Sequence, residues 1–433
     1  MPQELIQLDA NKRSIRIALI VLIVLATLWS YFAFRWYLGN TMAEYFNTGQ
    51  NNLDLAKVAH NLAPNDPLTN WRLAEVSQKQ LPLDQSAVAL SQFEKAVGRS
   101  PYDYRFWLAL GVAREQAGDT SGGELALRRA VALAPSYANP HWHLGNLLLR
   151  TGRYDEAFAE LRTASEADPA GLRSQMFNLV WEVNNSDFES LVKGIGPNSD
   201  SRAQFALYLL GQQRFDEALR MWNSLSAYEK KANKPTGDQI LSTLIGYSRF
   251  HDALNVWNDL VPVASYRVEE GKITDGGFEE QISYTPDFVF AWQVRTVGQM
   301  EIGIDPGISH SGTRSLRLVF QVRSQLDAIQ AAQMVPVTKD TEYEFECYVK
   351  TVKLVTGGPP IIQIVDLNTG LALASSDPAP GDSDWSRIGL SFKTSDKTEA
   401  IAIRISRAAC EDAKMCPIFG TVFYDDFSLK RRN

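Results

Sequence analysis

The side chains that most often carry out chemistry are sparse in this chain of 433 residues. Its five histidines are His60, His141, His143, His251 and His310. His141 and His143 are two positions apart, so on a helix their rings project about 200° from each other and do not form a metal-binding pair. The sequence contains no serine-nucleophile elbow, phosphate-binding glycine loop or zinc-ligand spacing. We therefore expect a protein that is not an enzyme. The acid/base pair of carboxylates in a glycosidase has no fixed sequence spacing, so the sequence alone does not test for it, and nothing in this chain points to one.

The three cysteines are too few for a disulfide scaffold. Cys410 and Cys416 bracket a short charged loop that ends at Pro417. In an oxidising compartment this spacing favours a local disulfide, and two free thiols are the alternative. Cys347 lies in an alternating run and is expected to be a buried, inert core residue.

The overall charge excludes one class of partner. The formal net charge is −7 and the sequence pI is about 5.4. No stripe of Lys and Arg interleaved with aromatic residues is present, so we expect no nucleic acid to bind. The length allows two or three domains.

An apolar segment near the N-terminus predicts where the protein resides. Residues 17–34 carry no charge and are just long enough to cross a hydrocarbon core of about 30 Å. Lys12, Arg13 and Arg16 precede the segment and only Arg35 follows closely. The positive-inside rule then places residues 1–16 in the cytoplasm, a transmembrane anchor at 17–38, and the remainder on the periplasmic or extracytoplasmic side of the inner (plasma) membrane. A cleaved signal peptide is the competing interpretation, but the bulky aromatic end of the segment offers no small-residue cleavage site.

A period of 34 residues organises the next part of the chain. Pro101, Pro135 and Pro169 are evenly spaced, and small residues recur between them, with Gly111 and Gly145 in equal positions. A fixed period of this length indicates a helical solenoid of two helices per unit. The segments 104–135 and 138–169 resemble the tetratricopeptide repeat, and weaker copies extend the predicted solenoid over 39–265.

The resemblance to tetratricopeptide repeats implies a concave surface that binds a protein partner and is lined by the first helix of each unit. His141 occupies the slot of Trp107 one repeat earlier, so we expect it to pack rather than ligate. The residues that this register turns toward the groove are Arg105, Val112, Glu115 and Gln116 in one unit and Asn139, Trp142, Asn146 and Arg150 in the next. Trp142 and Arg150 are of the types that most often anchor a partner. Packing of Trp142 on a neighbouring repeat is the alternative.

The pattern changes after Pro262 from helical periodicity to short alternating stretches separated by turn residues. In one stretch Ile401, Ile403 and Ile405 alternate with polar residues, which is typical of a half-buried strand. Several such strands predict a β-sandwich over 272–433. The predicted fold class is therefore α + β multidomain, with a transmembrane helix, an all-α solenoid and an all-β jelly-roll sandwich.

Short motifs in this last region resemble the jelly-roll carbohydrate-binding modules of the galactose-binding-like type. They are Gly276-Gly277-Phe278-Glu279, the His310–Arg317 turn and strand, and the closing Tyr424–Leu429 strand. The resemblance implies a glycan-binding surface and a structural Ca²⁺ ion held by Glu279, Asp425 and Asp426, which suits the preference of calcium for oxygen ligands. Carboxylates that merely cap turns are the alternative. The candidate glycan-binding residues are Tyr284, Trp292, Trp385 and Arg404, with Tyr348 among the further aromatics.

These observations together predict a non-enzymatic, membrane-anchored envelope scaffold. Its solenoid is expected to bind a protein partner and its sandwich a polysaccharide, in exopolysaccharide or cell-envelope assembly. Two alternatives stay open from the sequence. One is a pure protein-assembly adaptor whose sandwich binds no sugar, and the other is an accessory subunit of a membrane glycosyltransferase or polymerase.

Overall fold

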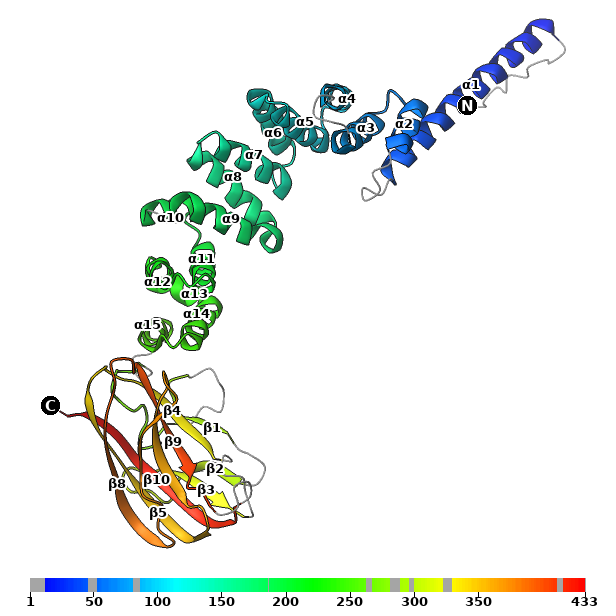
Figure 1. The fold of residues 1–433 in the computed structure, drawn as a ribbon. Helices are drawn as coiled ribbons and strands as arrows, with labels where there is room; N and C mark the ends of the chain where they lie inside the picture. The colour runs from blue at the N-terminus through cyan, green and yellow to red at the C-terminus, as the bar shows by residue number, and fades with distance from the viewer. Residues whose placement is uncertain are drawn as a thin grey trace, which may run out of the picture. The chain divides into compact units, whose positions relative to one another are not determined.

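The computed structural model describes residues 12–45, 53–80, 86–185, 187–261, 267–280, 289–295, 300–321, 329–410 and 416–432. The chain forms two compact units, Met1–Asn198 and Ser199–Asn433. The first is entirely helical, and the second combines helices with all the strands that the structure describes (Figure 1).

The first unit contains a long N-terminal helix followed by paired shorter helices. They are α1 (Arg13–Glu44), α2 (Leu53–Leu62), α3 (Pro67–Gln80), α4 (Ser86–Arg99), α5 (Tyr104–Gln116), α6 (Thr120–Leu133), α7 (Ala138–Arg150), α8 (Tyr154–Ala167), α9 (Pro169–Asn184) and α10 (Phe188–Ile195). Aspartates begin several of them, since Asp103 accepts a hydrogen bond from the Arg105 N–H and Asp119 from the Gly122 N–H. The helix pairs α5/α6 and α7/α8 coincide with the two predicted repeats.

Glycines permit the close approach of the two helices within each pair. A Cβ atom on Gly111 would lie 2.6 Å from Cγ of Leu127, and one on Gly145 would lie 2.7 Å from Cγ of Leu161. Both leucines are fully buried. The equal contacts one period apart confirm that the 34-residue spacing reflects a repeated packing unit.

Helix α1 continues from the apolar segment into the solenoid without a break. Its C-terminal part packs on the next helices, with Gly39 and Ala43 buried. Arg35 donates a hydrogen bond to the Asn61 carbonyl at 2.9 Å, and the Arg72 Nε donates to the Ala43 carbonyl at 3.1 Å. The predicted boundary between the anchor and the repeats at residues 38 and 39 thus falls inside one helix.

The second unit begins with five more helices. They are α11 (Ser199–Gly211), α12 (Phe215–Asn223), α13 (Ala227–Ala232), α14 (Lys234–Gly246) and α15 (Phe250–Leu260). Helix α15 contacts the β-region directly. Asn258 exchanges two hydrogen bonds with the backbone of Val268, at 3.0 and 3.1 Å, and the Phe250 N–H donates to Glu399 at 3.1 Å. The last helices therefore group with the sandwich rather than with the preceding repeats.

The β-region is a sandwich of two antiparallel five-stranded sheets. Its strands are β1 (Gln293–Arg295), β2 (Met300–Asp305), β3 (Ser315–Phe320), β4 (Gln330–Pro336), β5 (Glu342–Thr356), β6 (Pro360–Asp366), β7 (Ala372–Ser375), β8 (Ser383–Lys393), β9 (Ala400–Arg407) and β10 (Ile418–Arg431). One sheet has the order β1-β4-β9-β6-β7 and the other β2-β3-β10-β5-β8. We call them the β9 sheet and the β10 sheet.

The sandwich encloses one apolar core to which both sheets contribute. In β9 the side chains of Ile401, Ile403 and Ile405 are buried while Arg404 is exposed, as the alternation predicted. Tyr424 and Phe427 of β10 pack in the same core. The predicted fold class, an α + β multidomain chain with an apolar N-terminal helix, helical repeats and a C-terminal β-sandwich, is confirmed.

Candidate functional site

In two consecutive repeats, α5 and α7 are each tied to the preceding turn by an equivalent side-chain contact with a proline carbonyl. The Trp107 Nε1–H donates to the Pro101 carbonyl at 2.9 Å, and His141 Nε2 lies 2.9 Å from the Pro135 carbonyl. The other ring nitrogen of His141, Nδ1, lies 2.6 Å from a carboxylate oxygen of Glu160. His141 is buried. It takes the place of Trp107 one repeat later, so its predicted packing role is confirmed.

Several predicted partner-binding residues are joined from repeat to repeat along α3, α5 and α7. Gln78 donates to Gln116 at 2.5 Å, and the Arg150 Nε donates to Glu115 at 2.7 Å. These bonds link residues 38 and 35 positions apart. The line of amide and charged groups presents both donors and acceptors on the first helices of consecutive repeats.

The remaining predicted groove residues differ in how freely they can meet a partner. Trp142 is half-buried on α7, and its carbonyl accepts a hydrogen bond from the Asn146 side chain at 2.8 Å. Asn139 is exposed. Arg105 is engaged by the helix-capping carboxylate of Asp103, with the shortest contact at 2.6 Å. Trp142 therefore offers only part of its ring, and the exposed polar groups surround it.

A second charged network joins the second helices of two repeats. Arg128 of α6 contacts Glu124 at 2.8 Å and Glu156 of α8 at 3.0 Å, and Arg153 contacts both glutamates. Burial raises the pKa of Glu124, but hydrogen bonds from Arg153 and Arg128 outweigh it and hold that pKa below its usual range. These charges are mutually satisfied, so this face is a poorer candidate for an acidic or basic partner.

In the sandwich, three aromatic rings gather on the outer face of the β10 sheet. His310, from the turn before β3, stacks on Tyr348 of β5 with ring centroids 3.6 Å apart, and Trp385 of β8 meets His310 edge-on at 5.7 Å. Tyr348 and Trp385 are half-buried, so parts of both rings face solvent. We name His310, Tyr348 and Trp385 the aromatic patch.

Hydrogen bonds to carboxylates of the last strand hold His310 in place. Asp426 lies 2.6 Å from His310 Nδ1, and Asp425 accepts the His310 backbone N–H at 2.7 Å. Asp426 adopts a positive φ of 51°, at a point where the register of β10 against β5 shifts between Asp425 and Ser428. The irregularity re-aims the Asp426 side chain toward the turn, as β-bulges commonly do.

Ion pairs border the aromatic patch on the same sheet. Lys350 contacts Asp384 at 2.5 Å, and the Arg387 Nε donates to Glu346 at 3.0 Å. The hydrogen bond from Arg387 lowers the pKa of Glu346, and the bond from Lys350 lowers the pKa of Asp384. Planar polar groups beside exposed aromatic faces are the chemistry that recognises sugar hydroxyls and pyranose rings.

The structure divides the glycan-binding residues predicted from the sequence. Trp385 belongs to the aromatic patch, but Arg404 lies on the β9 sheet, where it contacts Gln363 at 3.2 Å. Trp292 is only 2% exposed and packs against Phe278 and Phe427, so the prediction that it stacks on sugar is wrong. Tyr284 lies outside the described residues.

The three carboxylates predicted to bind calcium all lie against the turn that precedes β3. Glu279 accepts the Thr313 N–H at 2.6 Å and the Arg314 N–H at 3.0 Å. These bonds, led by the Thr313 hydroxyl, lower the pKa of Glu279, whereas burial raises the pKa of Asp425. A Cβ atom on Gly277 would lie 3.8 Å from Cγ of Glu279 and 3.9 Å from an oxygen of each of Asp425 and Asp426, so all three side chains lie around this glycine.

The three carboxylates are of the chemical type that calcium prefers, but their oxygens are not arranged around one point where an ion could bind. Donors from the turn already bind oxygens of all three, including the Ser311 hydroxyl on Asp426 at 2.6 Å. In the part of the chain that the structure describes, no group of three or more His, Cys, Asp or Glu side chains is arranged to hold a metal ion. The calcium site stays a prediction from the sequence, and we assign the ion no role in the function.

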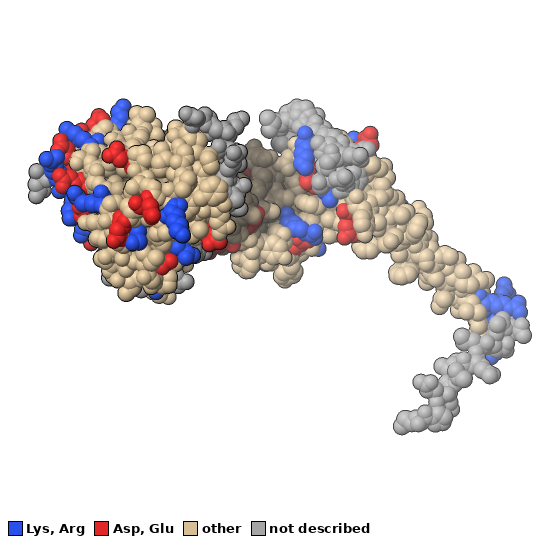
Figure 2. All heavy atoms as spheres, turned by 90° about the horizontal axis from the view of Figure 1, so that it is seen from below, with Lys and Arg blue, Asp and Glu red and all other residues tan. Residues whose placement is uncertain are grey.

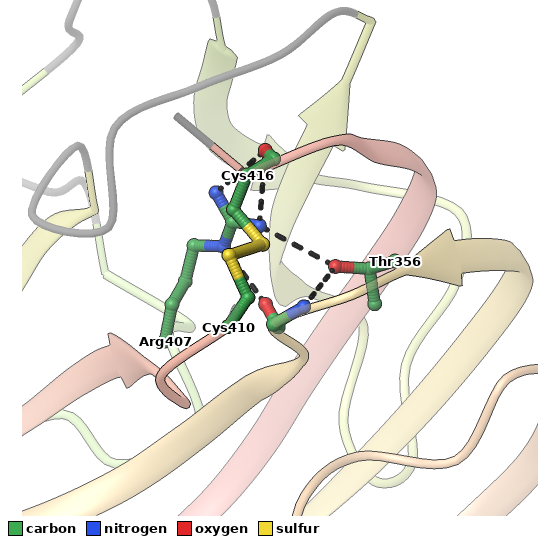
Figure 3. The surroundings of a disulfide bond; sticks show 5 residues. Thr356, Arg407, Cys410 and Cys416 are labelled. Carbon is green, nitrogen blue, oxygen red and sulfur yellow. Dashed lines mark hydrogen bonds between the residues drawn. A yellow bond between two sulfur atoms is a disulfide. The ribbon is translucent and has the colours of Figure 1, made fainter. Parts of the chain in front are cut away.

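The predicted disulfide between Cys410 and Cys416 is present, with Cα atoms 6.4 Å apart (Figure 3). The buried Arg407 lies beside it and donates from both terminal nitrogens to the Cys416 carbonyl at 3.3 Å. Its Nε donates to the Gly358 carbonyl at 2.9 Å. Arg407 thereby fixes the disulfide to the turn between β5 and β6. Cys347 is fully buried, as predicted, and burial raises the pKa of its thiol.

Comparisons with known proteins identify the helical repeats. Residues 83–138 and 114–179 each match a model of the tetratricopeptide repeat. No curated protein matches the chain. The family models confirm the predicted repeats in this part of the solenoid.

Solved structures resemble the two halves of the chain separately. PilF of Pseudomonas aeruginosa is 15% identical over 45% of this chain and 90% of its own, with a TM-score of 0.32. YrrB, described as a TPR protein with an unusual peptide-binding site, is 17% identical over 40% of this chain and 73% of its own, with a TM-score of 0.25. A CBM4 structure is 14% identical over 37% of this chain and 99% of its own, with a TM-score of 0.29.

Proposed function

We propose that this protein, in which tetratricopeptide repeats follow an apolar N-terminal helix and precede a β-sandwich, is a non-enzymatic membrane-anchored scaffold of the cell envelope. Its repeats bind a protein partner, and the outer face of its β10 sheet binds a glycan. The observation that carries the glycan assignment is the aromatic patch, in which His310, Tyr348 and Trp385 lie together on one solvent-facing surface.

The patch suits a sugar chain because it combines ring faces with fixed polar groups. Tyr348 and Trp385 come from adjacent strands, so their rings lie along a line that crosses the sheet. Arg387 and Glu346 supply donors and acceptors next to it. A partner with alternating apolar faces and hydroxyl edges, such as a polysaccharide, matches both properties.

The protein partner is assigned to the first helices of the repeats. The groove residues on α5 and α7 include the half-buried Trp142 and the exposed Asn139 and Arg150. A partly exposed Trp surrounded by polar groups is the usual composition of a binding anchor. We expect an extended or helical protein segment to lie across these helices.

Helix α1 supports a retained anchor over a cleaved signal peptide. It is long and apolar enough to cross a membrane, and Figure 2 shows it as an extended rod with few charges and with Lys and Arg near one end. Its final ten residues belong to the folded solenoid through Arg35, Gly39 and Ala43. Cleavage just after the apolar segment would cut the helix that the first repeat packs against. A cytoplasmic N-terminus then places the repeats and the sandwich on the periplasmic or extracytoplasmic side, where the disulfide is stable.

A polysaccharide pull-down with the full-length protein in detergent tests the glycan assignment. We expect capture by at least one insoluble or immobilised polysaccharide, and we expect Trp385→Ala and Tyr348→Ala each to reduce it about fivefold, as loss of a stacked ring costs roughly 1 kcal/mol. Tyr228→Ala is the matched control, because Tyr228 is a highly exposed tyrosine (82%) in the same unit and away from the patch. Equal capture by the patch variants and the control would remove the patch from the proposal. No capture by any polysaccharide would favour the pure protein-assembly adaptor.

A reporter fused after Asn433 tests the orientation. We expect it to be active only if it is a periplasmic or extracytoplasmic marker. Activity of a cytoplasmic marker in that position would refute the orientation and the oxidising environment assigned to Cys410 and Cys416.

A further inference from the structure

Strand β8 forms an open edge of the β10 sheet. It is eleven residues long, and among the strands that the structure describes it pairs only with β5. The Thr394 N–H donates to the Thr341 carbonyl at 2.9 Å, which shows that the even-numbered residues at this end of β8 direct their backbone groups toward β5. In an antiparallel pair the residues at alternate positions turn their backbone groups away from the partner strand. Arg387, Gly389 and Ser391 therefore direct their N–H and C=O groups toward the free edge.

A groove of about 400 Å³ runs beside this edge. One wall is the Ser386–Leu390 part of β8, and the other is the segment 375–380. This second wall is tied to the opposite sheet, because the Ser376 N–H donates to the Ile362 carbonyl at 2.9 Å and the Ala379 N–H to the Pro360 carbonyl at 3.0 Å. The groove thus lies where the edges of the two sheets open to solvent, and its volume is in the range of ligand-binding sites.

The groove has an aliphatic floor and charged ends. Ile388 and Leu390 point into it and are only partly buried, although both pack against the core. Exposed carboxylates stand at the start of β8 and on the opposite wall, and β8 ends at an exposed lysine. These residues are Asp377, Asp382, Asp384 and Lys393. Among the described residues that line the groove there is no aromatic ring on which a sugar could stack.

We propose that the free edge of β8 binds an extended peptide segment of a partner protein as an added antiparallel strand. The free N–H and C=O groups at Arg387, Gly389 and Ser391 supply main-chain hydrogen bonds, as in other cases of strand addition. Alternate apolar side chains of the peptide cover Ile388 and Leu390. The carboxylates at the start of β8 select a basic residue at the C-terminal end of the peptide. This surface adjoins the aromatic patch along β8, but it uses the main chain of the strand rather than the aromatic rings, so it does not depend on glycan binding.

A labelled probe peptide of sequence Glu-Thr-Ile-Thr-Val-Thr-Lys-Lys, blocked at both ends, tests this proposal with the full-length protein in detergent. We expect saturable binding by fluorescence anisotropy and slower amide hydrogen exchange in residues 386–392. A peptide with proline in place of the central threonine lacks a donor and should bind more weakly. Absence of saturable binding to the unmodified protein would overturn the proposal.

Gly389→Pro removes one donor from the free edge and no hydrogen bond to β5, so the strand should tolerate it. We expect about tenfold weaker peptide binding, since a lost backbone hydrogen bond and an obstructed edge cost on the order of 1.4 kcal/mol. Ser391→Ala keeps the backbone intact and is the matched control. Equal binding by Gly389→Pro and the control would overturn the proposal.

A charge exchange tests the orientation independently of any effect of proline on folding. Asp382→Lys should weaken binding of the peptide that ends in Lys-Lys and strengthen binding of one that ends in Glu-Glu. If both peptides respond alike, the antiparallel addition is wrong. Loss of polysaccharide capture in Gly389→Pro without any peptide binding would assign the edge to glycan and likewise overturn the proposal.

Discussion

Gly39 is the position at which the anchor helix can be separated from the solenoid by one substitution. A Cβ atom there would lie 2.8 Å from the Ala59 carbonyl oxygen and 2.8 Å from the Cβ of Ala63. One of these contacts is with backbone, so no side-chain rotation can relieve it. Gly98, within α4, has no atom within 4 Å of the equivalent Cβ position. Gly39→Leu and Gly98→Leu therefore form a matched pair.

The free-energy change expected for Gly39→Leu is the sum of two opposing effects. Replacing a helical glycine by leucine favours the helix by about 0.8 kcal/mol at either site. At Gly39 the leucine must also push α1 and α2 apart, and overpacking of this kind costs about 3 kcal/mol at the upper end of its range. The net change is a loss of about 2 kcal/mol in the local packing of α2, or roughly 30-fold in its opening equilibrium. At Gly98 only the gain applies.

Native-state hydrogen exchange of the full-length protein in detergent measures both effects. We expect amides of residues 53–62 to exchange roughly 30-fold faster in Gly39→Leu, and amides of α4 to exchange no faster in Gly98→Leu. Unchanged protection of residues 53–62 in Gly39→Leu would refute the conclusion that α1 is a packed part of the first repeat. It would also remove the argument against signal-peptide cleavage.

Three further outcomes are expected. Combined Trp142→Ala and Arg150→Ala substitutions should reduce capture of the protein partner at least tenfold while changing the free energy of unfolding by about 1–2 kcal/mol; a much larger loss would show that Trp142 is a core residue. If calcium binds, the protein should melt several degrees lower in chelator than in millimolar calcium, because an ion at a hundredfold excess over its Kd stabilises the fold by about 2.7 kcal/mol. Asp426→Ala should abolish this difference. Identical melting curves with and without chelator would show that the protein binds no stabilising calcium ion. Cys410→Ser should lower the melting temperature of the sandwich without affecting capture of the protein partner by the repeats, since closure of a short loop contributes at most about 2–3 kcal/mol. An unchanged melting temperature would mean that Arg407 alone holds the turn.

The sequence predicted the elements better than their junctions. The alternation of Ile401, Ile403 and Ile405 with polar residues predicted a half-buried strand, and β9 buries all three isoleucines. The packing slot shared by Trp107 and His141 was readable because both residues stand at one place in a 34-residue period. The continuation of α1 to Glu44 was not, since the apolar signal ends at Phe34 while the helix is then held by contacts with residues far along the chain.

The candidate glycan site was only partly predictable for a related reason. An aromatic residue in a strand gives no indication of whether it faces the core or solvent unless the register is known, and a slip of one residue reverses the answer. Trp292 and Trp385 therefore looked equivalent, although one is buried and the other is partly exposed. His310 lies in the turn before β3 and Tyr348 in β5, and these two elements do not pair with each other. The local sequence around either residue therefore does not predict that the two rings stack.

Because α1 runs without a break, it couples the apolar segment rigidly to the first repeat. No loop separates Phe34 from Gly39, so no flexible residue there can absorb a rotation of the apolar segment before it reaches the first repeat. Each residue of helix advances about 1.5 Å and turns about 100°. Insertion or deletion of one residue between Phe34 and Gly39 would therefore turn the first repeat by about 100° about the helix axis relative to the apolar segment. The number of residues in this stretch thereby sets the direction in which the first repeat faces relative to the apolar segment.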